Sequence, residues 1–483
     1  MGINDGCECN KSFSSSYMLV KPQEAKILDL GRLLFSKNVK KRKFVDSSHP
    51  NEFNFWHRFF ISLSIIVLKF LQLFATPLAL LGFCLEFILN FLSSNDGFFG
   101  ILLNVLRLKL KLPESSSAEY QSVIGHLDGR IMLDKNIKPG DVNYFGALCM
   151  MASKLAYENQ ARVQHIVNNV WEMEFLGFFN FWNEYEEKGS TQVFMMRDTK
   201  VDQHDTIIVS FRGTEPFSAD DWCSDFDISW YEIKGIGRIH GGFMKALGLQ
   251  KSTGWPKKID RQDQERHPLA YYTLRKRLKK LMKENEGARF VVTGHSLGGA
   301  LAILFPFILA FHDQQLLLER LEGVYTFGQP RVGDCKLGEF MLKTFSHYNI
   351  RYYRFVYGFD MVPRLPLDDK ALMFKHFGSC IYFDRNYVPK VLEEEPFKNY
   401  FSILGEVVMR IQACFEIVRS FTIGRRRGKE YEERVLLRIV RLFGLLLPGI
   451  PAHCPQDYIN STRLGSLNNV ISFSKTEYDV KIQ

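Results

Sequence analysis

The segment Val291-Val292-Thr293-Gly294-His295-Ser296-Leu297-Gly298-Gly299 holds the pattern Gly-x-Ser-x-Gly at the junction of two predicted elements. The apolar run at 289–293 predicts a short buried strand, and the residues after Ser296 predict a helix. A tight turn there exposes the serine hydroxyl above a sheet, and Gly294 and Gly298 carry no Cβ atoms to block it. This position favours a nucleophilic Ser296, since the pattern alone arises by chance in roughly one such chain in six. A serine that only caps the helix is the alternative.

The segments around this turn alternate between strands and helices. A helix is predicted at 144–158, and strands are predicted at 191–196, 206–211, 323–327 and 351–357. Such alternation predicts an α/β fold of the α/β-hydrolase type, with a mostly parallel central sheet that helices cover on both faces.

A serine hydroxyl is a weak nucleophile until a histidine accepts its proton, and in α/β-hydrolases an acid and then the histidine follow the serine along the chain. Asp360 begins a loop directly after the strand at 351–357, where α/β sheets build their sites, and is the best candidate for the acid. Asp334 is the second candidate. Capping of a turn is the alternative role for either aspartate.

Four histidines follow the nucleophile in the chain: His312, His347, His376 and His453. His312 lies at the far end of the helix that leaves Ser296, and His347 lies in a polar, surface-like stretch. His376 and His453 therefore remain as candidate bases.

Several blocks in register resemble the class-3 lipase family, which includes the filamentous-fungal triacylglycerol lipases. They are SFRGT (210–214), GHSLGGALA (294–302), TFGQPRVGD (326–334) and DMVPRLP (360–366), and the resemblance covers most of 141–392 and 448–466. It implies that Asp360 is the acid and that His453, in the block AHCPQDY, is the base. His376 matches a structural histidine of the family and becomes the candidate base only if the insertion at 393–447 displaces His453.

The resemblance also implies an oxyanion hole made by the backbone N–H groups of Thr214 and Leu297, with no metal or organic cofactor. Leu297 begins a helix, where free N–H groups and the dipole favour an anion, and Thr214 follows a strand. An ordinary turn with a salt-bridging Arg212 is the alternative for this block. Residues 217–230 match the family's mobile lid, since acidic residues alternate with aromatic ones there; ordinary packing of a surface helix is the alternative.

Residues 59–92 are almost wholly apolar, and Pro77 divides them into two arms that are each short of the roughly 20 residues a bilayer-spanning helix needs. Basic residues lie on both sides, at 37–43 and 107–111, and prefer the same cytosolic face. We therefore expect a hairpin in one leaflet or in the monolayer of a lipid droplet. A single kinked transmembrane helix and a helical pair buried in a soluble core are the alternatives. Residues 98–112 predict an interfacial helix.

The insertion before His453 predicts two amphipathic helices, at 398–421 and 431–447, with a basic turn at 424–428 between them. Such helices suit a lipid surface, a cover over the acyl site, or a contact between subunits of a homo-oligomer. Packing against the core is the alternative.

Composition agrees with one catalytic domain and a lipid-contacting segment. The net charge of +9 lies in clusters beside apolar stretches, which favours an anionic membrane surface over nucleic acid. Nine cysteines without regular spacing indicate a reducing, cytosol-facing location. We expect a flexible polar region at 1–52, a hydrophobic segment at 53–112, a linker at 113–140, the catalytic domain at 141–470 and a tail at 471–483.

The expected function is hydrolysis of triacylglycerol, and also of diacylglycerol, at a lipid–water interface. The apolar N-terminal run and the late insertion resemble more particularly the plant oil-body lipases, which implies the triacylglycerol of storage droplets as substrate. A phospholipase A1 or another acyl hydrolase is the alternative enzyme, since a triad does not recognise the rest of the lipid. The alternative outside enzymes is an inactive lipid-droplet scaffold.

Overall fold

The computed structural model describes residues 16–35, 43–49, 53–141, 143–183, 186–200, 204–249, 267–366, 374–398, 403–428, 431 and 433–465. The described part includes every candidate residue of the catalytic site. The predicted tail at 471–483 and most of the first basic cluster, at 37–42, lie outside it.

Eight strands of the described residues form the central sheet. In order across it they are β12 (Pro389–Leu392), β11 (Ser379–Phe383), β10 (Arg351–Tyr357), β9 (Leu321–Phe327), β8 (Arg289–His295), β5 (Thr206–Phe211), β4 (Lys188–Asp198) and β3 (Glu174–Asn183). The strands from β11 to β5 run parallel, and antiparallel pairing adds β12 at one edge and β4 and β3 at the other. The predicted α/β fold with a mostly parallel sheet is confirmed.

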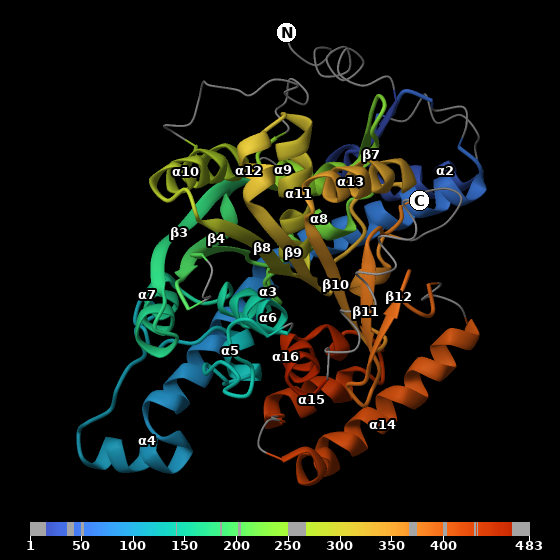
Figure 1. The fold of residues 1–483 in the computed structure, drawn as a ribbon. Helices are drawn as coiled ribbons and strands as arrows, with labels where there is room; N and C mark the ends of the chain where they lie inside the picture. Colours follow the sequence, from blue (N-terminus) through green and yellow to red (C-terminus); the bar gives the residue numbers. More distant parts are fainter. Residues whose placement is uncertain are drawn as a thin grey trace.

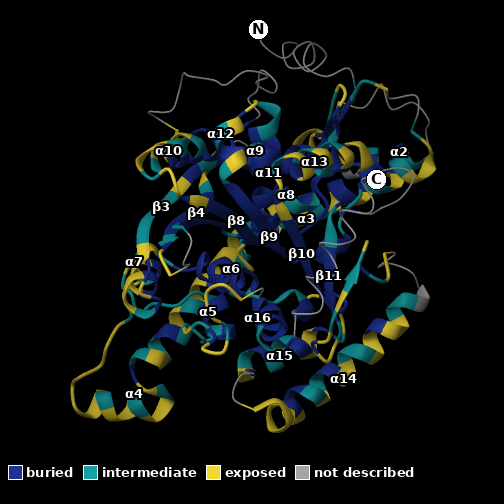
Figure 2. Cartoon of the chain, viewed as in Figure 1, coloured by how far each residue is buried: buried dark blue, intermediate teal, exposed yellow. Residues whose placement is uncertain are grey.

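Helices cover both faces of this sheet, and its strands are therefore apolar at successive positions. In β8, Phe290 and Val292 pack into one core and Val291 packs into the other. The first core lies under α10 (Ala270–Glu284), α11 (Leu297–Phe311) and α13 (Cys335–Tyr348), and the second lies under α6 (Tyr144–Leu155) and α16 (Pro455–Leu464) (Figure 1). Figure 2 shows the strands between these layers as buried.

Short elements connect these layers. They are α5 (Val123–Leu127), α7 (Gln160–His165), η3 (Ile166–Val170), α8 (Ala219–Phe226), α9 (Gly241–Ala246), α12 (Gln315–Arg320), η4 (Val362–Arg364) and η6 (Pro451–His453).

A small second sheet joins the N-terminal part of the chain to the catalytic domain. Its order is β2 (Val45–Ser47), β1 (Tyr17–Val20), β6 (Trp230–Ile233) and β7 (Gly237–His240), with η1 (Pro22–Glu24) and α2 (Ile27–Phe35) between the first two strands of the chain. The expectation of a flexible polar region throughout 1–52 is therefore wrong for this part. The run Tyr17–Val20 is too short to predict a strand by itself, and it becomes one by pairing with β6, more than two hundred residues away.

The apolar N-terminal segment is one continuous helix, α3 (Phe55–Ser94), with Pro77 inside it. The turn expected near Pro77 is absent, because a proline removes one backbone hydrogen bond and the rest of a long helix continues past that defect. The chain turns instead at Asn95 and Asp96, and α4 (Gly97–Leu106) follows. The side chain of Asn95 fixes this turn: its amide donates to Lys111 O at 2.8 Å and its oxygen accepts from Lys111 N–H at 3.0 Å. The expected division of residues 59–92 into two arms at Pro77 is therefore wrong, and α4 lies in the segment 98–112 that was predicted as a separate interfacial helix.

α3 is docked lengthwise on the catalytic domain. Near one end, the Ser64 hydroxyl donates to Phe226 O at 2.8 Å, and near the other, the Asn90 amide donates to Gln121 O at 2.8 Å. Of the described helices it alone is long and apolar enough to cross a membrane. Contact with one polar domain at both ends nevertheless holds the helix flat against that domain.

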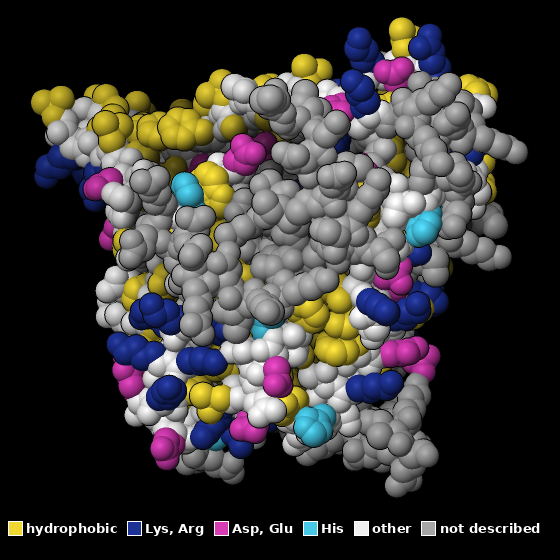
Figure 3. All heavy atoms as spheres, turned by 90° about the horizontal axis from the view of Figure 1, so that it is seen from above, with side chains coloured by type: hydrophobic (Ala, Val, Ile, Leu, Met, Phe, Trp, Pro, Cys, Tyr) yellow, Lys and Arg dark blue, Asp and Glu magenta, His cyan; other side chains and the backbone are white. Residues whose placement is uncertain are grey.

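The opposite face of α3 and most of α4 expose apolar side chains. Leu73 is 75% exposed, Leu80 is 62% exposed and Phe99 is 79% exposed. Figure 3 shows hydrophobic side chains gathered along one edge of the molecule. An apolar surface of this extent is typical of a site that contacts lipid or another protein.

The insertion forms α14 (Ile403–Arg427) and α15 (Val435–Phe443), which pack against each other. The two predicted helices are present, but the basic residues Arg425, Arg426 and Arg427 form the last turn of α14 rather than a separate turn. A row of large apolar side chains on α14 is exposed: Val407, Val408, Ile411, Phe415, Val418 and Phe421.

Candidate active site

Ser296 lies in the sharp turn between β8 and α11, with a backbone φ of 59°. A non-glycine residue stays in this left-handed region only where its surroundings hold it there. Close backbone contacts require the flanking glycines: an ideal Cβ on Gly294 would lie 2.2 Å from the Gly298 carbonyl carbon, and one on Gly298 would lie 2.3 Å from Phe211 O. The turn therefore places the Ser296 hydroxyl at the carboxyl end of β8.

His453 lies between Ser296 and Asp360. Its Nε2 atom is 2.8 Å from Ser296 Oγ, and its Nδ1 atom is 2.7 Å from Asp360 Oδ2. Asp360 is fully buried in the loop after β10, and His453 ends η6, directly before α16. The structure thus brings together the three residues that the sequence proposed as nucleophile, acid and base.

The Asp360 carboxylate is held by further donors. Val362 N–H donates to Oδ1 at 2.9 Å, and the Tyr458 hydroxyl donates to Oδ2. Burial and the neighbouring Asp360 raise the pKa of Tyr458 well above its ordinary value, so this hydroxyl remains a donor. Tyr458 was not predicted, because only the fold places α16 beside the loop after β10.

The two remaining candidates lie away from the nucleophile in structural roles. Asp334 Oδ1 accepts from Leu337 N–H at 3.0 Å and caps α13. His376 Nε2 lies 2.7 Å from Pro363 O and 3.9 Å from Glu395. Burial, and then the nearby Arg354, hold the pKa of His376 well below its ordinary value.

A second histidine, His295, supports the backbone of His453. Burial and the neighbouring His453 hold the pKa of His295 well below its ordinary value, so its ring is neutral and has one N–H. His295 Nε2 lies 2.9 Å from His453 O, and a carbonyl can only accept, so Nε2 is the protonated nitrogen. Nδ1 then accepts from the Tyr157 hydroxyl at 2.9 Å. This contact fixes the backbone that carries the base, and nothing in the local sequence indicated it.

The two proposed oxyanion positions flank Ser296. Leu297 is the first residue of α11, where backbone N–H groups have no partner within the helix. Thr214 follows β5, and an ideal Cβ on the adjacent Gly213 would lie 3.1 Å from Ser296 Cβ. The Thr214 hydroxyl donates to Asp225 Oδ2 at 2.7 Å, which ties this loop to α8. Arg212 forms an ion pair with Glu215, as in the alternative interpretation of this block.

The predicted lid segment, residues 217–230, contains α8 and ends at Trp230, the first residue of β6. Ile228 and Trp230 pack into a core with Ile61 and Ile65 of α3. Ile228 and Trp230 therefore have the ordinary packing role that was the alternative to a mobile lid. In α8, Trp222 and Phe226 stack with ring centroids 6.1 Å apart. Burial, together with the carboxylates of Asp221 and Glu186, raises the pKa of Asp225 to about 8.

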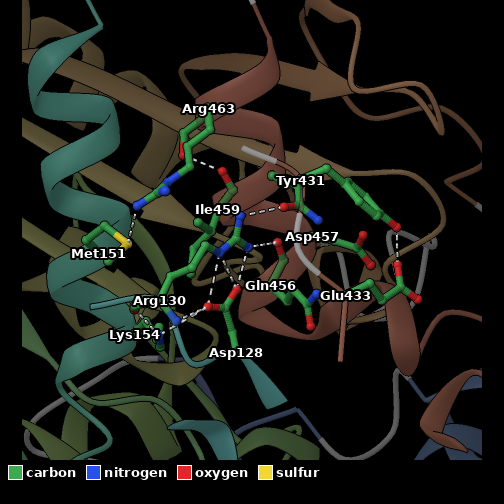
Figure 4. A network of polar contacts seen from close by, with 12 residues as sticks. Asp128, Arg130, Met151, Lys154, Tyr431, Glu433, Gln456, Asp457, Ile459 and Arg463 are labelled. Atoms are coloured by element: carbon green, nitrogen blue, oxygen red, sulfur yellow. Dashed lines mark hydrogen bonds and ion pairs between the residues drawn. The ribbon is translucent and has the colours of Figure 1, made fainter. Parts of the chain in front are cut away.

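Two buried ionic clusters anchor α16 directly after His453. On one side, Arg130 binds Asp128 and donates to Asn460 Oδ1 at 2.7 Å, with Lys154 Nζ 3.3 Å from Asp128 (Figure 4). Burial opposes ionisation of Asp128, but Lys154 and Arg130 outweigh it and hold the pKa of Asp128 well below its usual range.

On the other side, Arg441 of α15 contacts three carboxylates: Glu433 at 2.5 Å, Asp457 of α16 at 3.0 Å and Glu416 of α14 at 3.1 Å. The Tyr431 hydroxyl also donates to Glu433, as Figure 4 shows. The insertion is therefore attached to the helix that follows the base, and it leaves His453 in contact with Ser296.

Comparison with known proteins places these features in a family. The model of the family described as lipase (class 3) matches residues 208–370. The chain is 40% identical to a triacylglycerol lipase OBL1 of Arabidopsis thaliana over 509 aligned residues, which cover 97% of this chain and 98% of that one. It is 42% identical to a triacylglycerol lipase OBL1 of Nicotiana tabacum, over 85% of this chain and 84% of that one. Among solved structures, the triacylglyceride lipase of Rhizomucor miehei is similar with a TM-score of 0.37 and 23% identity, over 50% of this chain and 81% of that one.

Proposed function

This chain belongs to the class 3 lipase family, and we propose that it hydrolyses the ester bonds of triacylglycerol through Ser296, His453 and Asp360. Hydrolysis of carboxylic esters of acylglycerols is the activity of this enzyme, since relatives matched over almost its whole length are triacylglycerol lipases. The observation that carries the assignment of residues is the position of His453, 2.8 Å from Ser296 Oγ and 2.7 Å from Asp360 Oδ2.

The reaction follows from this geometry. His453 Nε2 accepts the Ser296 proton as Oγ attacks the ester carbonyl carbon, and Asp360 stabilises the imidazolium that forms. The backbone N–H groups of Leu297 and Thr214 donate to the oxyanion. His453 then gives its proton to the leaving alcohol, and water, activated by the same histidine, hydrolyses the acyl-enzyme to a free fatty acid.

The enzyme acts at a lipid droplet surface, with the outer faces of α3 and α4 in the phospholipid monolayer. A helix of 40 residues is about 60 Å long, roughly twice the thickness of a bilayer core, and α3 is docked along the catalytic domain. These features support a helix that lies in one monolayer rather than one that crosses a bilayer. Arg107, Lys109 and Lys111 follow α4 and suit contact with anionic headgroups.

The exposed apolar row of α14 is a second surface of this kind. It lies on the insertion, beside basic residues that include Arg425, Arg426 and Arg427. An amphipathic helix with basic residues is typical of an interfacial helix. We assign it to lipid rather than to a contact between subunits; a concentration-independent monomeric mass in detergent would support this, and a stable dimer through α14 would contradict it.

Replacement of the nucleophile tests the assignment. We expect Ser296→Ala to lower hydrolysis of emulsified trioleoylglycerol by about a million-fold, while the protein still floats with lipid droplets. The control is Ser346→Ala, which removes an exposed hydroxyl on α13 and should leave activity unchanged. Activity of Ser296→Ala equal to that of the control would contradict the proposal.

Two further measurements separate the alternatives. A fluorophosphonate probe should label the wild-type protein and fail to label Ser296→Ala, whereas an inactive scaffold would not be labelled at all. Equal rates on phospholipid vesicles and on trioleoylglycerol would favour a phospholipase A1.

A further inference from the structure

A cavity of about 360 Å³ lies between α3 and the loop that precedes α8, and we call it the α3 cavity. Its volume is within the range of roughly 300–1,000 Å³ that is usual for small-molecule sites. It is lined by α3 between Ala75 and Glu86, by residues 122–124 and 215–220, and by Tyr157 and Lys188.

Small residues on one face of α3 create this space. Ala75, Ala79 and Gly82 follow one another at helical spacing and leave the backbone of α3 almost bare on the side toward the catalytic domain. The edge of the cavity is closely packed: an ideal Cβ on Gly82 would lie 2.6 Å from Phe217 Cβ. The wall that α3 provides is therefore apolar apart from Glu86, as an acyl chain requires, and the rest of the lining includes Lys188, Glu215 and Asp220.

The cavity lies between the lipid-facing helix α3 and residues that adjoin the catalytic site. Phe83 lines it and is 62% exposed, so the cavity borders the apolar face of α3. Glu215, which also lines it, directly follows the oxyanion residue Thr214, and the Tyr157 hydroxyl is bonded to His295 beside the nucleophile. A lipid held in this space would therefore lie next to the oxyanion loop.

The charged groups of the cavity are mainly carboxylates. Glu86, Glu215 and Asp220 line it, and the one cation among the described lining residues, Lys188, is already 2.7 Å from Asp220 and 3.0 Å from Glu186. Burial, together with the carboxylates of Glu215 and Glu158, raises the pKa of Glu86 to about 7. When protonated, Glu86 can donate a hydrogen bond to an ester carbonyl, whereas an added phosphate or carboxylate would meet the carboxylates of Glu215 and Asp220.

We infer that the α3 cavity binds one acyl chain of an uncharged acylglycerol, and that Glu86 and Glu215 select such lipids over anionic ones. This inference rests on the proposed function. Helix α3 then has two roles, since it forms part of the substrate site and also contacts the droplet. Anionic phospholipids of the monolayer are disfavoured as substrates, although they are the esters nearest to the enzyme. The fatty acid product, which is an anion, is disfavoured in the same way.

Filling the cavity tests acyl binding. In the full-length protein, Ala79→Trp should lower kcat/KM for emulsified trioleoylglycerol at least tenfold, with hydrolysis of the short, soluble ester p-nitrophenyl butyrate within twofold of wild type. The matched control is Lys276→Trp, which places the same ring on the exposed side of α10, outside the cavity lining, and should retain both activities. Equal trioleoylglycerol activity in the two variants would overturn the inference. Absence of p-nitrophenyl butyrate hydrolysis in the wild type would instead contradict the proposed function.

Reversing a charge tests selection. Glu86→Lys should lower the ratio of trioleoylglycerol to dioleoylphosphatidylglycerol hydrolysis at least tenfold. Glu119→Lys makes the same charge change at an exposed position outside the cavity lining and should leave the ratio within twofold. A ratio that Glu86→Lys leaves unchanged would contradict the assignment of selectivity to Glu86.

Direct mapping does not depend on how these variants fold. Ser296→Ala protein, incubated with a triacylglycerol that carries a diazirine in one acyl chain, should be cross-linked on illumination within residues 75–86 and 215–220. Cross-links confined to other segments would overturn the acyl site.

Discussion

Two histidines that follow the nucleophile in the sequence, His376 and His453, were candidate bases, and their surroundings differ. His453 faces Ser296 and Asp360, whereas His376 faces Pro363 O and Glu395. We expect His453→Asn to lower kcat by at least about a thousand-fold, because no other group of the site accepts the serine proton. His376→Asn should keep fluorophosphonate labelling and lower the free energy of unfolding by about 1–3 kcal/mol, because buried partners lose a donor. Labelling retained by His453→Asn and lost in a folded His376→Asn would reverse the assignment.

At the level of single residues, the sequence predicted the groups proposed to react but not the groups that position them. Ser296 was recognisable from the turn around it, and Asp360 from its place after a strand. Tyr458 and His295 were not, because each acts through a contact between elements that are distant in the chain: Tyr458 with Asp360, and His295 with the backbone of His453.

Among the elements, α8 carries acidic groups whose burial makes its packing sensitive to pH. The pKa of Asp225 is raised to about 8 in the packed state, against roughly 4 for an exposed aspartate. Because the pKa of Asp225 is higher in the packed state, protonation of Asp225 stabilises the packing of α8 fully below about pH 4. This stabilisation is lost as the pH rises through about 8. We expect hydrogen exchange of the α8 amides, corrected for the intrinsic rate, to accelerate by up to about tenfold per pH unit in this range.

Asp225→Asn should flatten this dependence, since the amide has no charge to bury and its oxygen can still accept from Thr214. Asp220→Asn is the control, because the Asp220 side chain is 51% exposed and pairs with Lys188. Equal pH dependence in Asp225→Asn and wild-type protein would exclude Asp225 as the cause.

The insertion is a second element whose attachment can be tested. Arg441 is buried among Glu433, Asp457 and Glu416. Arg441→Met removes the cation that contacts all three carboxylates and should lower the free energy of unfolding by about 3–5 kcal/mol. The exposed Arg410 pairs with Glu406 on α14, so Arg410→Met should change it by no more than about 1 kcal/mol. Chemical denaturation gives both values, and a similar small loss in both variants would contradict this role.

For the whole molecule, we propose that the outer face of α3 determines where the enzyme acts. We expect Leu73→Asp combined with Leu80→Asp to remove the protein from lipid droplets, because each leucine contributes about 1.5–3 kcal/mol when it leaves water. Hydrolysis of soluble p-nitrophenyl butyrate should persist, since the catalytic residues lie elsewhere.

Lys276→Asp combined with Lys280→Asp, on the exposed side of α10, is the control and should leave flotation with droplets unchanged. Flotation of the α3 variant at the wild-type level would show that another surface holds the enzyme on the droplet.

The sequence by itself determined the α/β sheet, the turn at Ser296 and the choice of Asp360 ahead of Asp334. These features depend on neighbours in the chain: the run of apolar residues that forms a strand, and the glycines that a tight turn needs. The apolar nature of 59–92 was equally plain, since composition alone reveals it.

Only the tertiary structure decided that α3 continues through Pro77, that β1 pairs with β6 and that α16 is fixed from two sides. It also decided that the insertion leaves His453 beside Ser296 instead of displacing it. The physical reason is that these features rest on contacts between residues separated by tens to hundreds of positions, such as Ser64 with Phe226 and Arg441 with Glu416. Local patterns predict which face of a helix is apolar, but they do not specify what covers it.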